Sequence, residues 1–88
     1  MKIKDGFILR TVGKEAVVVA VGSASADFNG IIHLNDTGEF LWKQLEKGNT
    51  KEGLVAALLD EYDITEELAE RDVEGFIAKL KKEELITE

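Results

Sequence analysis

The sequence predicts an α+β fold in which three strands form an antiparallel sheet and three helices follow it, in the order β-β-β-α-α-α. Up to Leu34, apolar residues alternate with polar ones or form short β-branched runs, which is typical of strands. After Asn35 they recur every three or four residues, which is typical of amphipathic helices. Residues 30–45 join the two patterns without a linker, so we expect the sheet to meet the helices at Asn35.

The first two strands are expected at residues 7–12 and 15–21, joined as a hairpin by the turn pair Gly13-Lys14. Residues 17–21 are all valine or alanine. This favours a central strand with both faces at least partly covered, although pairing at a sheet edge could also account for it. Residues 1–6 are expected to be a polar lead-in.

The third strand is expected at residues 31–34, after the turn pair Asn29-Gly30. Residues 22–30 before it have the composition of a loop, with Phe28 as an anchor that tucks into the core and the serines as loop formers. A loop of small residues can allow two chains to exchange a strand, so both a monomer and a strand-exchanged dimer remain open.

Each predicted helix begins with a residue whose side-chain oxygen can accept an unpaired amide of the first turn. These N-caps are Asn35, Thr50 and Thr65. The first helix is expected at about 36–46, ending at Gly48, with Trp42 on its buried face. The second runs to about Tyr62 and the third ends in a group of lysines, and residues 85–86 can dock as a short extension.

Length and composition limit the function classes. The 88 residues form one predicted domain, 1–88, without repeats, and bury only about 60–65% of the unfolded surface, which leaves little room for an enclosed active site. There is no cysteine, no secretory leader and no apolar run of the roughly 20 residues that a membrane span needs, so a cytoplasmic protein is expected. The net charge of −7 is concentrated after residue 35, where 7 basic residues face 15 acidic ones.

Residues for catalysis or metal binding are scarce. His33 is the single histidine and lies in a predicted strand, and no HxxxH, CxxC, GxGxxG or P-loop spacing occurs. The acidic residues fall mainly on outward helix positions, which is typical of a solvated surface. We therefore expect neither an enzyme nor a metal site nor a cofactor. A small enzyme or metal-binding protein that uses His33 is the weakest alternative.

Three helices beside a three-stranded sheet are also typical of winged helix-turn-helix regulators, which read DNA with the second helix of a pair. Such a helix needs Arg, Lys, Asn or Gln on its outward face. The second helix offers mainly acidic residues and the third begins with Glu66, Glu67 and Glu70, a charge that repels phosphates. Nucleic-acid binding is therefore the alternative function. An open three-stranded sheet also has an edge to which an extended peptide can add as a strand, but an edge merely exposed to solvent is the ordinary interpretation. Composition and periodicity alone therefore indicate only a small α+β binding domain.

The chain closely resembles the PqqD-like family, named for pyrroloquinoline quinone synthesis protein D, along residues 27–45, 50–62 and 69–80, and in the first two strands. The most specific pieces are Leu34-Asn35 followed by Gly38 and Trp42, and Asp72-Val73 followed by Phe76 and Leu80. The resemblance implies a winged-helix-like fold and a peptide chaperone, the recognition element for ribosomally synthesised, post-translationally modified peptides. Such proteins bind the leader of a precursor peptide as a strand added beside the third strand, in a groove closed by the third helix. They present it to a modifying enzyme, commonly a radical S-adenosylmethionine enzyme.

Carried onto this sequence, the resemblance implies a peptide-binding edge formed by Gly30, Ile31, Ile32, His33 and Leu34. The groove wall would come from one flank of the third helix, formed by Asp72, Phe76 and Lys79. The opposite flank, formed by Glu70, Glu74 and Lys81, is the alternative, and the sequence does not decide between them. Phe76 also fits a plain core role. The resemblance does not identify the peptide.

Overall fold

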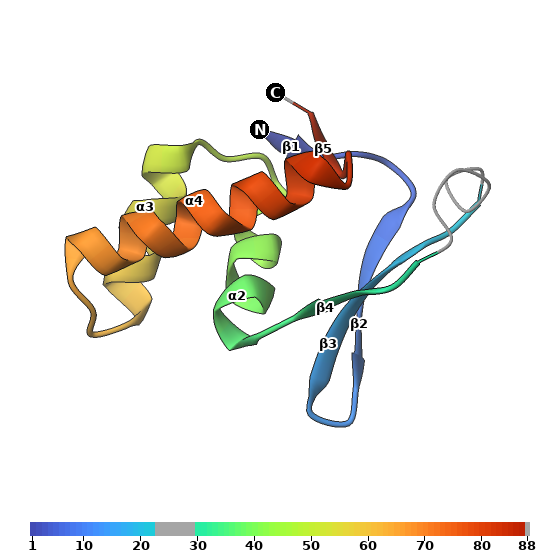
Figure 1. Cartoon of the computed structure of the whole chain (residues 1–88), viewed down its shortest axis with the longest axis horizontal. Coiled ribbons are helices and arrows are strands. Elements are labelled where there is room, and N and C mark those ends of the chain that lie inside the picture. Colours follow the sequence, from blue (N-terminus) through green and yellow to red (C-terminus); the bar gives the residue numbers. More distant parts are fainter. Residues whose placement is uncertain (23–29, 88) are drawn as a thin grey trace.

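The computed structural model describes residues 1–22 and 30–87 (Figure 1). Its elements in chain order are β1 (Lys2–Ile3), β2 (Phe7–Val12), β3 (Glu15–Ala20), β4 (Ile32–Leu34), α2 (Asp36–Leu45), α3 (Lys51–Glu61), α4 (Glu66–Lys82) and β5 (Ile86–Thr87). The predicted layout, a three-stranded antiparallel sheet followed by three helices, is confirmed. Two short strands at the ends of the chain are added to it.

The main sheet has the strand order β2-β3-β4, with both pairs antiparallel. β3 is therefore central, as its valine-rich sequence predicts. Val17 and Val18 point to opposite faces, and both are buried, at 9% and 0% exposure. On the face that carries Val17 the sheet also exposes apolar side chains, with Val12 at 65% and Ile31 at 60%.

The prediction that residues 1–6 are only a polar lead-in is wrong. β1 pairs antiparallel with β5, with Lys2 opposite Thr87 and Ile3 opposite Ile86, so the two ends of the chain lie side by side. Strands of two residues are too short to show an alternating pattern, which explains why the sequence does not reveal them. The predicted docking of residues 85–86 is confirmed, because Leu85 and Ile86 are buried.

All three predicted N-caps are confirmed. The side-chain oxygens of Asn35, Thr50 and Thr65 accept hydrogen bonds from the amides of Gly38, Gly53 and Leu68, at 2.7, 3.0 and 3.1 Å. α2 ends just before Gly48, which has a φ of +85°, a left-handed conformation that glycine adopts without strain.

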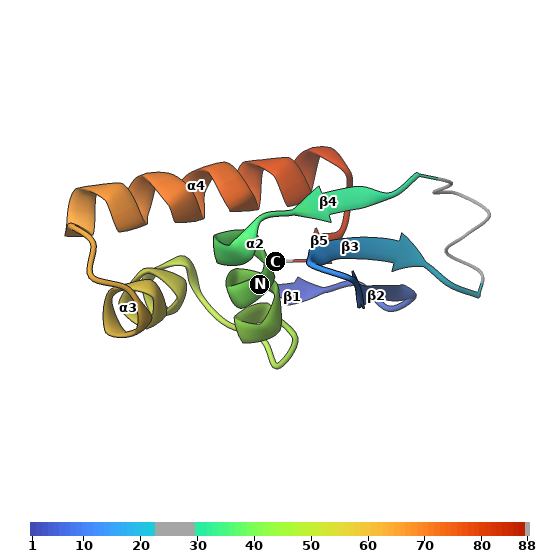
Figure 2. The same cartoon turned by 90° about the horizontal axis from the view of Figure 1, so that it is seen from below.

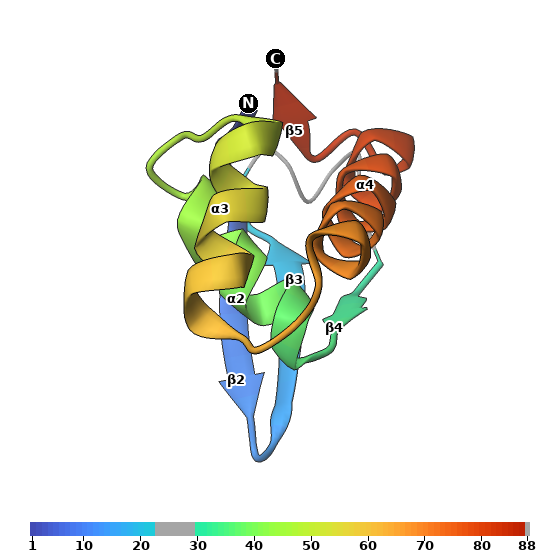
Figure 3. The ribbon, with the colours of Figure 1, turned by 90° about the vertical axis from the view of Figure 1, so that its left-hand side faces the viewer.

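The helices enclose one core. α3 and α4 pack against each other and α2 packs against both (Figure 3), and β4 is the strand of the main sheet nearest to α4 (Figure 2). Trp42 is fully buried and is the largest side chain of the core, which confirms its predicted place. In the described part of the chain no group accepts a hydrogen bond from its Nε1. The other fully buried large side chains are Leu41, Leu45, Leu54, Leu58, Leu80, Leu85, Val18 and Val73.

The predicted loop of residues 22–30, with Phe28 as its anchor, lies outside the described residues except for its end glycines. The strand-exchanged dimer stays a prediction for the same reason. Within the described ranges, no helix has the length and apolar character needed to cross a bilayer.

Trp42→Ala should lower the free energy of unfolding by about 3–5 kcal/mol, because it empties the centre of the core. A domain of this size has a total stability on the order of 5–10 kcal/mol, so thermal denaturation followed by circular dichroism should show a severely lowered Tm. Trp42→Phe is the matched control: it keeps most of the ring and removes the unpaired N–H, and should melt much closer to the parent. An alanine variant that melts within a few degrees of the parent would contradict this role of Trp42.

Candidate peptide-binding groove

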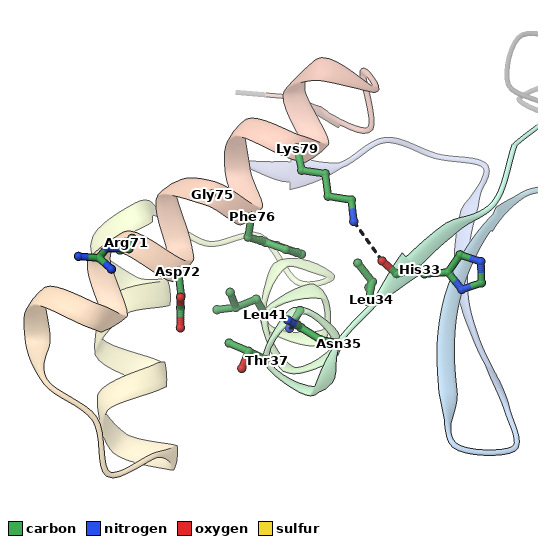
Figure 4. A pocket seen from close by; sticks show the side chains of 11 residues that line it. His33, Leu34, Asn35, Thr37, Leu41, Arg71, Asp72, Gly75, Phe76 and Lys79 are labelled. Atoms are coloured by element: carbon green, nitrogen blue, oxygen red, sulfur yellow. Dashed lines mark hydrogen bonds between the residues drawn. The ribbon is translucent and has the colours of Figure 1, made fainter.

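A cavity of about 430 Å³ lies where β4 passes into α2 and faces α4 (Figure 4). Its size is within the usual range of ligand pockets, roughly 300–1,000 Å³. The cavity is lined by His33, Leu34, Asn35, Thr37, Gly38, Leu41, Arg71, Asp72, Gly75, Phe76 and Lys79. It therefore joins the end of a sheet strand to one face of the longest helix.

The corner between β4 and α2 is fixed by Asn35. Its Oδ1 accepts the Gly38 amide at 2.7 Å, while its backbone is still extended, with φ −79° and ψ −179°. A Cβ on the buried Gly38 would lie only 3.1 Å from that Oδ1 and 3.4 Å from Leu34 Cβ. Glycine thus allows the first turn of the helix to close tightly against the end of the strand.

The edge of β4 away from β3 faces α4. No strand in the described part of the chain pairs with this edge. The Lys79 ammonium donates a hydrogen bond of 3.0 Å to the His33 carbonyl oxygen (Figure 4), so that carbonyl points toward α4. Backbone groups of an antiparallel strand alternate between its two sides. The N–H and C=O of Ile31 and His33 therefore point to the open edge, and those of Ile32 and Leu34 point to β3.

The floor of the cavity is apolar and its rim is polar. Figure 4 shows Leu34, Leu41 and Phe76 directed into the space between α4 and the β4–α2 corner. Leu41 and Phe76 are 1% and 8% exposed, so they belong both to the core and to the cavity wall. The half-buried Asp72 and Thr37 contribute oxygen atoms from opposite sides. This combination can hold an apolar side chain while hydrogen-bonding groups fix its backbone.

The predicted strand residues divide between cavity, core and surface. His33 and Leu34 line the cavity, while Ile32 is buried beneath the sheet at 6% exposure. Gly30 and Ile31 are exposed and continue the strand direction beyond the cavity.

The structure separates the two flanks of α4 that the sequence leaves open. Asp72, Phe76 and Lys79 line the cavity together with β4. The cavity lining does not include Glu70, Glu74 or Lys81, although all three lie in the described part of the chain. Glu74 instead forms an ion pair of 3.2 Å with Lys51 of α3.

Several lining residues are not anticipated as site residues by the sequence reasoning. Asn35, Thr37, Gly38 and Leu41 are interpreted there only as parts of the corner and the first helix, and Arg71 and Gly75 are overlooked. One feature of the sequence does indicate Arg71 and Gly75 as site residues. Arg71, Gly75 and Lys79 are spaced four residues apart, which places them on one helical stripe, and a glycine inside a helical pattern calls for an explanation.

The described residues contain no group of three or more His, Cys, Asp or Glu side chains that could hold a metal ion. His33 is exposed, and it contacts α4 through its backbone carbonyl, which accepts the hydrogen bond from Lys79.

A small α+β domain with an open strand edge facing an apolar groove belongs to the class of proteins that can bind extended peptides. Its family follows from comparison of the sequence. The chain belongs to the PqqD family: the family model described as coenzyme PQQ synthesis protein D matches residues 15–86. Curated proteins offer no significant match.

Two solved structures share the fold. TbiB1 in complex with the TbiA(beta) leader peptide superposes with a TM-score of 0.77 and 28% identity, covering 97% of this chain and 93% of that one. Lasso peptide synthetase B1 complexed with the leader peptide gives a TM-score of 0.76 over 99% of this chain and 96% of that one. At 20% identity the second likeness concerns the fold alone.

Asn35→Ala should lower the free energy of unfolding by about 1 kcal/mol, because an amide of the first turn loses its acceptor. Urea denaturation measures this change. Asn35→Asp is the control, since a carboxylate keeps the acceptor and suits the positive end of the helix dipole. Equal losses in the two variants would show that the cap is not what Asn35 contributes.

Proposed function

We propose that this protein is a non-catalytic module that binds the leader of a ribosomally synthesised precursor peptide by strand addition along β4. The open edge of β4 beside an apolar groove is the observation that carries the proposal. The family and the fold support it, as does TbiB1, a relative of the same shape that is known in complex with a leader peptide.

Strand addition uses the backbone first. The outward N–H and C=O groups of Ile31 and His33 offer an incoming strand two positions for paired hydrogen bonds. Because these bonds do not depend on side chains, they give affinity without selectivity, and pockets beside the edge supply the selectivity. Here the pocket is formed by Leu34, Leu41 and Phe76, with Asp72 and Lys79 as polar partners.

Lys79 contacts the same strand edge that an added peptide would use. It contacts the His33 carbonyl in the unbound protein, at the point where a peptide amide would donate. A carbonyl oxygen has two lone pairs, so it can accept from the ammonium and from an added strand. The ammonium also places a positive charge over one end of a groove in an otherwise acidic protein.

We further propose that the bound peptide is presented to a separate modifying enzyme, a radical S-adenosylmethionine enzyme, in the cytoplasm where precursor peptides are synthesised. The support is at the level of the family, whose description refers to synthesis of coenzyme PQQ. Co-purification of the chain with such an enzyme, strengthened by added peptide, would test this part separately from peptide binding.

Binding can be tested with two probes. The first is the TbiA(beta) leader peptide, and the second is a displayed library of random peptides of about twelve residues, longer than a typical strand. Amide NMR shifts should appear at residues 31–34 and at the α4 residues that line the cavity. Shifts confined to α3, or selective binding of DNA instead of peptide, would favour the winged-helix regulator.

His33→Pro should abolish binding of a selected peptide and preserve the fold, because it deletes an outward N–H and proline is tolerated at a strand edge. Ile32→Pro deletes an amide that faces β3 and should unfold the domain. His33→Ala is the control: it leaves the backbone intact and should weaken binding by only about 1 kcal/mol or less. Calorimetry measures binding and circular dichroism measures folding. Loss of binding in His33→Ala equal to that in His33→Pro would contradict backbone pairing at this position.

A further inference from the structure

Gly75 lies in the interior of α4, and nothing in the described part of the chain requires a glycine there. It is exposed, and a Cβ added to it would meet no described atom within 4 Å. Its φ is not in the left-handed region that favours glycine, in contrast to Gly13, Gly22 and Gly48. The two other helical glycines differ as well, because a Cβ on Gly38 or Gly53 would press against a capping side chain.

A glycine in a helix interior is unfavourable, since it loses more backbone entropy than any other residue. A kink does not explain it, because α4 runs straight from Glu66 to Lys82 (Figures 1 and 2). Packing against the remainder of the chain does not explain it either, because the space beside it is open. The place of Gly75 within the groove offers an explanation.

Gly75 lines the cavity between Asp72 and Phe76, and Arg71 and Lys79 stand one turn to either side on the same stripe (Figure 4). Arg71 and Lys79 carry side chains and Gly75 does not, so along this stripe the surface of α4 is indented at Gly75 alone. We call this point the Gly75 notch. It faces the same cavity as the apolar side chains of Leu34, Leu41 and Phe76.

We infer that the Gly75 notch receives a large apolar or aromatic side chain of the bound peptide, and that it makes this residue the one by which the groove selects its leaders. This inference rests on the proposed strand addition. Along an added strand, alternate side chains point to opposite faces, so one set is directed between β4 and α4. Such a side chain meets bare backbone at Gly75 and the ring of Phe76 beside it.

The chemistry of the notch favours an apolar residue over a charged one. Phe76 and Leu41 form the apolar floor of the cavity, where a charged group would lose hydration, whereas the charged side chains of Arg71, Asp72 and Lys79 lie at its rim. An aromatic ring gains most, because it buries a large area and can pack edge-to-face against Phe76.

The test is a change of selectivity. Random peptides are selected in parallel on the parent, Gly75→Ala and Gly75→Leu. The parent should enrich peptides with a large apolar or aromatic residue at one fixed position, and Gly75→Leu should enrich Gly, Ala or Ser at that position. Peptides selected on the parent should bind Gly75→Leu about tenfold or more weakly, the range that steric exclusion from an apolar pocket produces.

Thermal stability and peptide binding should change in opposite directions in Gly75→Ala. Gly75→Ala should raise the Tm, because alanine is the better helix former and meets no obstacle, and it should weaken binding of the parent's peptides. Ala78→Gly is the matched control: Ala78 is exposed on the same helix and does not line the cavity. It should lower the Tm and leave the selected sequences unchanged.

The selections distinguish a failure of this inference from a failure of the proposed function. If no peptide is enriched on the folded parent, the proposal of peptide binding is wrong. If peptides are enriched but the parent and Gly75→Leu select the same residue at every position with equal affinity, the notch is overturned while strand addition stands.

Discussion

The direct passage from β4 into α2, held by the bond between the Gly38 amide and Asn35 Oδ1, is the constraint on which the groove depends. Without a linker, the position of α2 fixes the position of the strand before it. α2 is in turn held by Trp42 and Leu45 at the centre of the core. The edge of β4 is therefore presented to α4 by core packing, which is more rigid than a loop and suits a site that pairs backbone with backbone.

The same geometry explains how a protein with a charge of −7 can still offer a suitable surface to a peptide. The acidic residues of α4 that do not line the cavity include Glu70 and Glu74, on the flank away from β4. On the groove side stand Arg71 and Lys79, whose ammonium reaches the His33 carbonyl. The charged side chains that line the groove, Arg71, Asp72 and Lys79, thus sum to +1, so the overall charge of −7 is a poor guide to the groove.

Much of this fold follows from the sequence because each local signal agrees with the global arrangement. The three caps, the central strand and the buried Trp42 are all visible in residue type and spacing. The pairing of β1 with β5 is not, since two-residue strands at opposite ends of the chain carry no period. For the site, the family resemblance implies the edge residues and two candidate flanks of α4, but the sequence does not decide which flank faces the edge. That choice depends on how α4 packs, a tertiary property.

The groove brings together features that are unfavourable in an isolated chain. One strand edge has backbone groups without a strand partner in the described residues, and one helix has a glycine where alanine would be more stable. Two such features in one cavity are better explained together than separately. An added strand would pair with the edge of β4, and its side chain would cover the bare backbone at Gly75. Both costs to the free protein would then be offset by the same ligand, which is what a preorganised peptide groove requires.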